Sequence, residues 1–192
     1  MKENKKKKQG VDFESKIINS IKEILPYIIV ILVVIIIKTF IVSPIKVNGT
    51  SMYSTLHDGD IMILNKITYR FNDIKRFDVV VVDTPLEPII KRVIGLPGDV
   101  IEYKNYKLYV NGNLVEEEFL TDAVRKDTCK YSDNYDIDIC SNKFTVPEGR
   151  YFVLGDNRGN SIDSRYLGFL RKERITGRAK YILFPFNRIK SI

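Results

Sequence analysis

Histidine is nearly absent from the sequence, which contains only His57 among its 192 residues. Any Ser-His-Asp triad would have to use this residue, which follows Ser51 and Ser54 within one short stretch. Triad members usually come from separate elements that converge in space, and the Asp-Gly-Asp after His57 is typical of an exposed loop. The scarcity of histidine therefore argues against a triad. It leaves the hydroxyls of VNGTSMYSTL (47–56) without an obvious proton acceptor.

Cysteine is also scarce, with only Cys129 and Cys140 present. Two cysteines without partnering histidines exclude a typical structural zinc site, and we expect neither metal nor cofactor. In an oxidising compartment the pair would close a short loop and stabilise the fold by roughly 2–3 kcal/mol on the chain-entropy model. Pairing cannot be deduced from sequence, so two free thiols remain the alternative.

A concentrated basic face is missing, although the formal net charge is +7. Residues 1–23 carry seven lysines against four acids, and residues 43–192 carry 23 basic and 20 acidic side chains. The main body is therefore nearly balanced, and no nucleic-acid partner is expected.

One long apolar run, Ile24–Val42, contains a single charge, Lys38. As a helix it would span roughly 28 Å, close to the hydrocarbon thickness of a bilayer. The run is longer than the core of a cleaved signal peptide, and no small-x-small site follows it. A buried core helix would be the alternative, but the run has no polar face. We predict a transmembrane helix over 23–43.

The lysine-rich flank predicts the orientation of this helix. By the positive-inside rule, residues 1–22 form a cytoplasmic tail. The protein is then a single-pass protein of the cell membrane, with the lipid bilayer as a partner and everything after the helix outside the cytoplasm.

The outer body lacks helical periodicity and consists of short β-branched runs. Strands are expected within 60–66, 77–83, 87–95, 99–105, 106–117, 150–156 and 177–186. Asn111-Gly112 between two apolar runs predicts a hairpin with a type I′ turn. Only 49–56 and 162–174 are expected to hold short helices. The fold class is mainly β, a coiled antiparallel sheet formed by 44–103 and 147–192. Residues 104–146 form an inserted subdomain or hairpin excursion.

Two motifs suggest a penicillin-recognising serine peptidase. Ser43-Pro44-Ile45-Lys46 matches S-x-x-K, and Ser132-Asp133-Asn134 matches S-D-N. No K-T-G occurs, and the first motif lies at the membrane exit. We therefore interpret both as chance matches.

Lysine is another candidate proton acceptor, and Lys91 lies in the apolar strand PIIKRVIG (88–95). Burial disfavours the charged form, so the pKa of a buried lysine falls. A drop of about 2–3 units would make its neutral amine a useful base for a serine hydroxyl. The alternative is that Lys91 and Arg92 both reach solvent at a sheet edge.

Four stretches occur in order behind the apolar run: NGTSMYSTL (48–56), ILNKITYRF (63–71), KRVIGLPGD (91–99) and GDNRGNSIDSR (155–165). Together they resemble the sequence boxes of the bacterial type I signal peptidases, membrane-bound serine endopeptidases with a Ser-Lys dyad. The similarity covers nearly the whole chain. It implies removal of signal peptides from secretory preproteins, with cleavage after small-x-small motifs.

The resemblance assigns roles by position. Ser51 matches the nucleophile, Lys91 the general base, and Ser161 a serine that hydrogen-bonds and orients the lysine. We expect an ionic scaffold behind the site from Asp156, Arg158, Asp163 and Arg165. Some relatives have an oxyanion-stabilising serine where this chain has Gly49. The Ser51 amide is then one expected donor to the oxyanion, and the Gly49 amide or a water is the other.

The apolar residues expected to shape shallow substrate pockets are Val47, Met52, Ile89 and Ile90. Other functions remain open. Self-cleaving repressors share Ser-Lys chemistry and a related β fold, but they are soluble, which the apolar run argues against. A degenerate, non-catalytic anchored β-domain would look similar in sequence.

Overall fold

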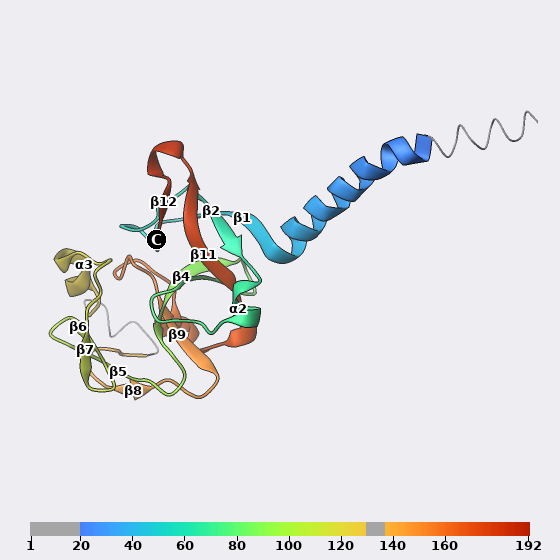
Figure 1. Ribbon diagram of the computed structural model, residues 1–192. Coiled ribbons are helices and arrows are strands. Elements are labelled where there is room, and N and C mark those ends of the chain that lie inside the picture. The colour runs from blue at the N-terminus through green and yellow to red at the C-terminus, as the bar shows by residue number, and fades with distance from the viewer. Residues whose placement is uncertain (1–19, 130–136) are drawn as a thin grey trace, which may run out of the picture. The chain divides into compact units, whose positions relative to one another are not determined.

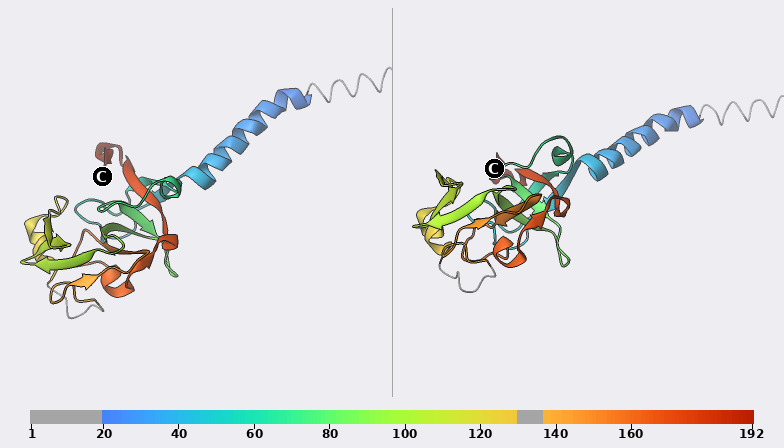
Figure 2. Two further views of the ribbon diagram at one scale, coloured as in Figure 1. Left: turned by 60° about the horizontal axis from the view of Figure 1, so that its bottom comes forward. Right: turned by 90° about the horizontal axis from the view of Figure 1, so that it is seen from below.

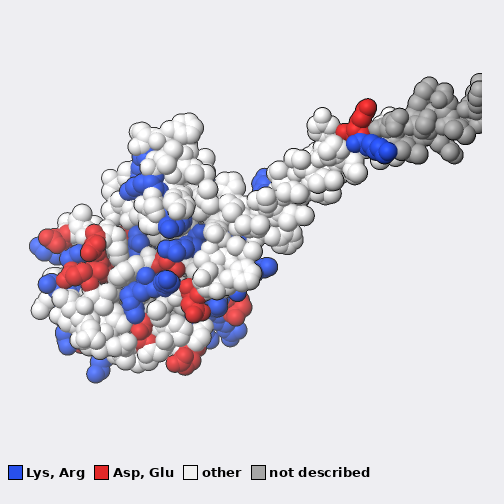
Figure 3. Space-filling model, in the orientation of Figure 1, with Lys and Arg blue, Asp and Glu red and all other residues white. Residues whose placement is uncertain are grey.

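The computed structural model describes residues 20–129 and 137–192, which form two compact units that meet between Ile41 and Val42. The first contains a helix over Ser20–Ile41 whose last turn, η1 (Ile37–Ile41), is a π-helix. The helix is long and apolar enough to cross a membrane, and its apolar side chains are exposed. Its surface is uncharged between charged groups near its two ends (Figure 3).

The helix ends two residues before the predicted limit at position 43. Strand β1 (Val42–Lys46) begins at once and pairs with β2 (Ile61–Asn65) from Val42↔Asn65 to Lys46↔Ile61. Pro44 explains the early end, because a proline disfavours helical backbone in the residue before it.

The second unit is built on an antiparallel sheet in the order β1-β2-β11-β3-β4-β9-β10, with β12 paired to β11 (Figure 1). Its further strands are β3 (Val79–Val82), β4 (Ile89–Gly95), β9 (Arg150–Leu154), β10 (Leu170–Arg171), β11 (Ile175–Phe184) and β12 (Lys190–Ser191). Strand β11 shifts register against both β2 and β3. Such irregularities bend and twist a strand, which allows the sheet to curl.

Both faces of this sheet carry apolar clusters. All four valines of β3 are buried: Val79 and Val81 belong to one cluster, Val80 and Val82 to the other. Successive residues of a strand point to opposite faces, so a strand covered on both sides is a continuous apolar run. The VVVV stretch is therefore the central strand of a two-faced core.

A second sheet of four strands runs in the order β7-β6-β5-β8. It comprises β5 (Val100–Lys104), β6 (Lys107–Val110), β7 (Asn113–Val115) and β8 (Phe144–Thr145). Asn111 and Gly112 both have positive φ, as a type I′ turn requires. Strands β5–β7 and helix α3 (Asp122–Asp127) lie together at one side of the unit in Figures 1 and 2. Most of this sheet lies within the expected insertion, 104–146. Strand β5 is also part of the sheet, although it begins before the insertion.

The short helices differ in part from the expectation. The stretch 49–56 forms hydrogen-bonded turns and no helix, and Gly49 and Ser54 have positive φ values there. Helix α4 (Ser164–Leu167) and the 3₁₀ turn η3 (Lys172–Arg174) lie where short helices were expected. Helix α2 (Thr68–Phe71), α3 and the 3₁₀ turn η4 (Phe186–Arg188) were not anticipated, because such short segments show no periodicity.

The disulfide joins Cys129 and Cys140, with 5.7 Å between their Cα atoms. The alternative of two free thiols is therefore wrong. The bond ties Cys129, two residues after the end of α3, to Cys140, which packs against the core shared by β4, β5, β6 and β9.

Candidate active site

Ser51 lies in the turn that follows β1. Tyr53 N donates to Thr50 O at 2.9 Å and Leu56 N donates to Met52 O at 2.8 Å, which closes the turn. Met52 and Leu56 are buried in the cluster on one face of the main sheet. The apolar side chains of MYSTL thus anchor the turn and leave the Ser51 hydroxyl at its surface.

Lys91 comes from β4, forty residues further along the chain, and its Nζ donates a hydrogen bond to Ser51 Oγ at 2.7 Å. The same Nζ donates to the carbonyl oxygen of Ile90 at 3.0 Å. The lysine is only 2% exposed. The alternative that Lys91 reaches solvent at a sheet edge is therefore wrong.

Burial lowers the pKa of Lys91 from 10.5 to about 8. The carboxylates of Asp163 and Asp156 oppose this shift, and Arg165 adds to it. A neutral amine has one lone pair and two N–H groups. With one N–H donated to Ile90 O, its lone pair can face the Ser51 hydroxyl and accept the proton.

Arg92, the next residue of β4, binds Asp156 through two parallel hydrogen bonds. Arg92 Nε lies 2.9 Å from Asp156 Oδ1, and Nη2 lies 2.6 Å from Oδ2. Thr55 Oγ1 also donates to Asp156 Oδ2 at 2.5 Å. Asp156 therefore ties three segments together: β4, the turn that carries Ser51 and the end of β9. The sequence indicated Asp156 but not its partners.

Arg158 is fully buried and pairs with Glu117 of the second sheet's region, at 2.5 Å. It also donates to Tyr103 Oη at 3.1 Å and to Thr128 Oγ1 at 3.3 Å. Burial lowers the pKa of this guanidinium, but Glu117, Tyr103 and Asp156 together outweigh burial and raise the pKa above its usual range. The region expected as an insertion is thus joined to the active-site loop by a buried ion pair.

Asp163 and Arg165 form a third buried pair, with Nε at 2.8 Å from Oδ1. Asp163 Oδ2 also accepts from the Gly155 amide at 3.0 Å. None of the three pairs includes Ser51 or Lys91.

The loop after β9 also holds the backbone beside the nucleophile. Asn157 N donates to Ser51 O at 2.9 Å, and its Nδ2 donates to Thr50 O at 3.1 Å. Asn160 Nδ2 donates to Thr50 Oγ1 at 3.1 Å. These asparagines were not singled out from the sequence. Both lie within the motif GDNRGNSIDSR, for which roles were predicted only for the charged residues and Ser161.

Gly155 packs closely against the turn that carries Ser51. A Cβ atom built on Gly155 would lie 2.5 Å from Ser51 O and would also overlap the side chain of Ser161. Glycine is thus the residue that this packing admits.

Two expectations from the sequence are not met in this structure. The Ser161 hydroxyl is buried next to Gly155, but it has no hydrogen-bond partner among the described residues, so its predicted bond to Lys91 is absent. The Gly49 amide donates to Asp58 Oδ1 at 2.7 Å. It is therefore already engaged, and the suggestion that it is the second oxyanion donor is not supported.

The residues expected to shape the substrate pockets separate into two groups. Val47, Met52 and Ile90 belong to one buried cluster. Ile89 packs against the cluster on the opposite face, because neighbouring strand residues point in opposite directions. The structure therefore brings three of the four together.

The geometry does not favour a Ser-His-Asp triad, S-x-x-K chemistry or a metal site. His57 is exposed and its ring stacks on Tyr53, with 5.1 Å between the centroids. Ser43 and Lys46 lie three residues apart in β1 and so point to opposite faces, which rules out S-x-x-K chemistry. Ser132, Asp133 and Asn134 lie outside the described residues. No group of His, Cys, Asp or Glu able to hold a metal occurs in the part of the chain that the structure describes.

Comparison with known proteins identifies the family. Residues 19–184 match the family described as signal peptidase, peptidase S26. Signal peptidase I of Bacillus amyloliquefaciens is 38% identical over 187 residues, or 97% of this chain and 98% of that protein. Signal peptidase I T of Bacillus subtilis (strain 168) is 39% identical over 166 residues, or 85% of this chain and 84% of that protein. A signal peptidase I crystal structure from Enterococcus faecalis is 34% identical, covers 56% of this chain and 97% of that chain, and has a TM-score of 0.41. The chain therefore belongs to the signal peptidase I family of membrane-anchored serine endopeptidases.

Proposed function

We propose that this protein removes signal peptides from secretory preproteins with Ser51 as nucleophile and Lys91 as general base. The contact between Lys91 Nζ and Ser51 Oγ, at 2.7 Å, carries the proposal. A serine is a weak nucleophile by itself, and a buried lysine with a pKa of about 8 is partly neutral near physiological pH. The geometry and the protonation state thus favour the same chemistry.

The reaction follows from these two residues. Lys91 takes the Ser51 proton while Oγ attacks the scissile carbonyl carbon, which forms a tetrahedral intermediate. The lysine ammonium then gives the proton to the leaving amine, and an ester joins the preprotein's signal peptide to Ser51. Water, deprotonated by Lys91, hydrolyses this ester and restores the enzyme. No metal or cofactor takes part.

The Ser51 amide supplies one donor for the negative charge of the intermediate. No residue that the structure describes accepts a hydrogen bond from it. The Asn157 bond to Ser51 O helps to fix the orientation of the turn. A water is the remaining candidate for the second donor, since the Gly49 amide is bound to Asp58.

The apolar cluster next to the dyad supports a preference for small side chains. Met52 follows Ser51 and Ile90 precedes Lys91, and with Val47 they form a closely packed layer. We expect only shallow depressions over such a layer beside the nucleophile. Cleavage after small-x-small motifs would fit such a surface better than cleavage after large side chains.

The Ser20–Ile41 helix supports anchoring in the bilayer. With the lysine-rich flank in the cytoplasm, the catalytic unit meets preproteins after their translocation. Protease treatment of intact cells should digest the catalytic unit but spare an N-terminal tag. Protection of the catalytic unit instead would reverse the orientation.

Purified full-length protein should cut a preprotein after its small-x-small site without added metal. Ser51→Ala and Lys91→Ala should each lower turnover by at least 1,000-fold, on the order of the loss when a triad member is removed. His57→Ala is the matched control and should keep normal turnover. Normal turnover of Lys91→Ala would disprove the dyad, and covalent labelling of Ser43 by a penicillin would favour the transpeptidase alternative.

A further inference from the structure

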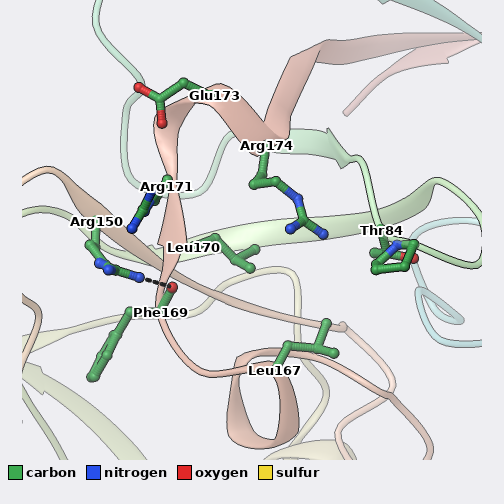
Figure 4. Close-up of a pocket in the computed structure, with 9 residues that line it drawn as sticks. Thr84, Arg150, Leu167, Phe169, Leu170, Arg171, Glu173 and Arg174 are labelled. Atoms are coloured by element: carbon green, nitrogen blue, oxygen red, sulfur yellow. Dashed lines mark hydrogen bonds between the residues drawn. The ribbon is translucent and has the colours of Figure 1, made fainter.

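A pocket of about 540 Å³ lies away from the dyad, beside β10 and η3 (Figure 4). Three arginines line it: Arg150 at the start of β9, Arg171 in β10 and Arg174 in η3. The Ser51–Lys91 chemistry uses none of them. The apolar part of the lining comes from Pro85, Leu167, Phe169 and Leu170.

Two of these arginines are direct cross-strand neighbours, since Arg171 pairs with Arg150 in the β9–β10 ladder. Like charges directly opposite each other destabilise an antiparallel pair. None of the three arginines forms an ion pair with a residue that the structure describes. Glu173 also lines the pocket, but it forms no ion pair with these arginines. The lining thus carries three positive charges against the single negative charge of Glu173.

Two of the guanidinium groups are held in place by backbone carbonyls. Arg150 Nη1 donates to Phe169 O at 3.2 Å, and Arg174 Nε donates to Asp83 O at 2.7 Å. Each bond leaves other N–H groups of the same side chain for a ligand. Side chains held in this way lose less conformational entropy on binding. The arrangement is preorganised for an anion.

The lining combines charge with apolar surface. In Figure 4, Arg150 and Arg171 lie on one side of Leu170 and Arg174 on the other, with Leu167 below. Leu167 is 41% exposed, so an apolar group of a ligand could cover it. Guanidinium groups bind phosphate oxygens through paired hydrogen bonds. Three guanidinium groups suit a tetrahedral phosphate better than a planar carboxylate, because a phosphate offers more acceptor oxygens.

We propose that this arginine pocket binds a phosphate group. A phospholipid headgroup is one source, and free phosphate is the other. The catalytic unit begins at the residue after a helix able to cross a membrane, which places headgroups at high local concentration. The site is independent of the proposed catalytic function.

The test uses the full-length protein in an uncharged detergent. Inorganic phosphate and dihexanoyl phosphatidylglycerol are titrated separately by calorimetry, with acetate at equal ionic strength as the control anion. At least one phosphate probe should bind saturably, and acetate should not. The triple variant Arg150→Gln/Arg171→Gln/Arg174→Gln should bind at least tenfold more weakly. The charge-matched variant Lys107→Gln/Lys143→Gln/Lys190→Gln, on exposed lysines outside the pocket, should bind within twofold of the wild type.

Leu167→Ser distinguishes the two sources. If a lipid is the ligand, this variant should weaken phosphatidylglycerol binding several-fold and leave inorganic phosphate binding unchanged. If both probes bind equally and Leu167→Ser has no effect, free phosphate is the ligand. Either result supports the phosphate site.

Several results would overturn the proposal: no saturable binding of either probe to the wild type, equal weakening in the lysine variant, or tighter binding of an acidic peptide than of both phosphate probes. The melting temperature without ligand checks the fold of each variant. Should the triple variant unfold, the single change Arg171→Gln, at an exposed side chain, replaces it and should still weaken binding measurably.

Discussion

Lys91 Nζ and Ser51 Oγ lie 2.7 Å apart, although forty residues separate them in the chain. A turn presents the serine and a buried strand presents the lysine. The contact places a buried amine of lowered pKa against a hydroxyl, beside the apolar cluster that contains Met52 and Ile90. Four predictions follow from this contact and the groups around it.

The rate of cleavage should rise with pH through the pKa of Lys91. With that pKa at about 8, most of the lysine is protonated at pH 6 and most is neutral at pH 9. Only the neutral amine accepts the Ser51 proton, so kcat/KM should increase about tenfold per pH unit below 8 and then level off. Initial rates on one preprotein between pH 6 and 10 measure this profile. A flat profile over that range would contradict the role of Lys91.

Replacing Lys91 by methionine should stabilise the protein while it abolishes cleavage. The folded-state pKa lies below the ordinary value of 10.5, so the folded chain binds the proton less readily than the unfolded chain does. The stability of the wild type therefore rises between about pH 8 and 10.5. Below pH 8 the folded chain bears the full cost of burying a protonated Lys91. The penalty is roughly 3 kcal/mol.

Urea unfolding of the full chain in detergent, followed by circular dichroism, measures this difference. Lys91→Met should exceed the wild type most at pH 7, and the gap should shrink towards pH 10.5. Ser51→Ala serves as the control, because it removes activity without removing the buried amine. A gap that is constant with pH would show that Lys91 titrates normally.

Gly155→Ala should inactivate the enzyme while it still folds. The added methyl group would lie 2.5 Å from Ser51 O and would overlap Ser161, so the turn of the nucleophile has to move. A displacement of about 1 Å is enough to lower turnover by about 100-fold. Gly159→Ala in the same loop is the matched control, because the nearest atom to its Cβ is Asp127 Cβ at 3.5 Å, an ordinary contact. Equal activity of the two variants would rule out a packing role for Gly155.

Glu117→Gln should destabilise the whole catalytic unit. It removes the carboxylate that neutralises Arg158, whose side chain is 0% exposed. Breaking a buried pair from one side typically costs about 3–5 kcal/mol. The double variant Glu117→Leu/Arg158→Met leaves no unpaired charge and should recover much of the loss. Melting temperatures of the three proteins give the comparison, and a double variant as unstable as Glu117→Gln would show that the charge is not the cause.

Local patterns were sufficient for much of the fold. The β-branched runs at 77–83 and 87–95 became β3 and β4, and Asn111-Gly112 became the predicted hairpin turn. The strand preference of VVVV and the positive φ of an Asn-Gly turn arise from neighbouring residues alone. The segments β8, β10 and β12 have two residues each, and only their partners make them strands.

The sequence by itself thus determined the apolar helix, the β class and the family, and its motifs predicted Ser51 and Lys91 as the dyad. The tertiary structure decided which groups meet: Asp156 with Arg92, Arg158 with Glu117, and the Gly49 amide with Asp58. It also left Ser161 without the expected bond to Lys91. Periodicity and turn chemistry act over a few residues, whereas these contacts depend on strand register and on packing between segments far apart in the chain.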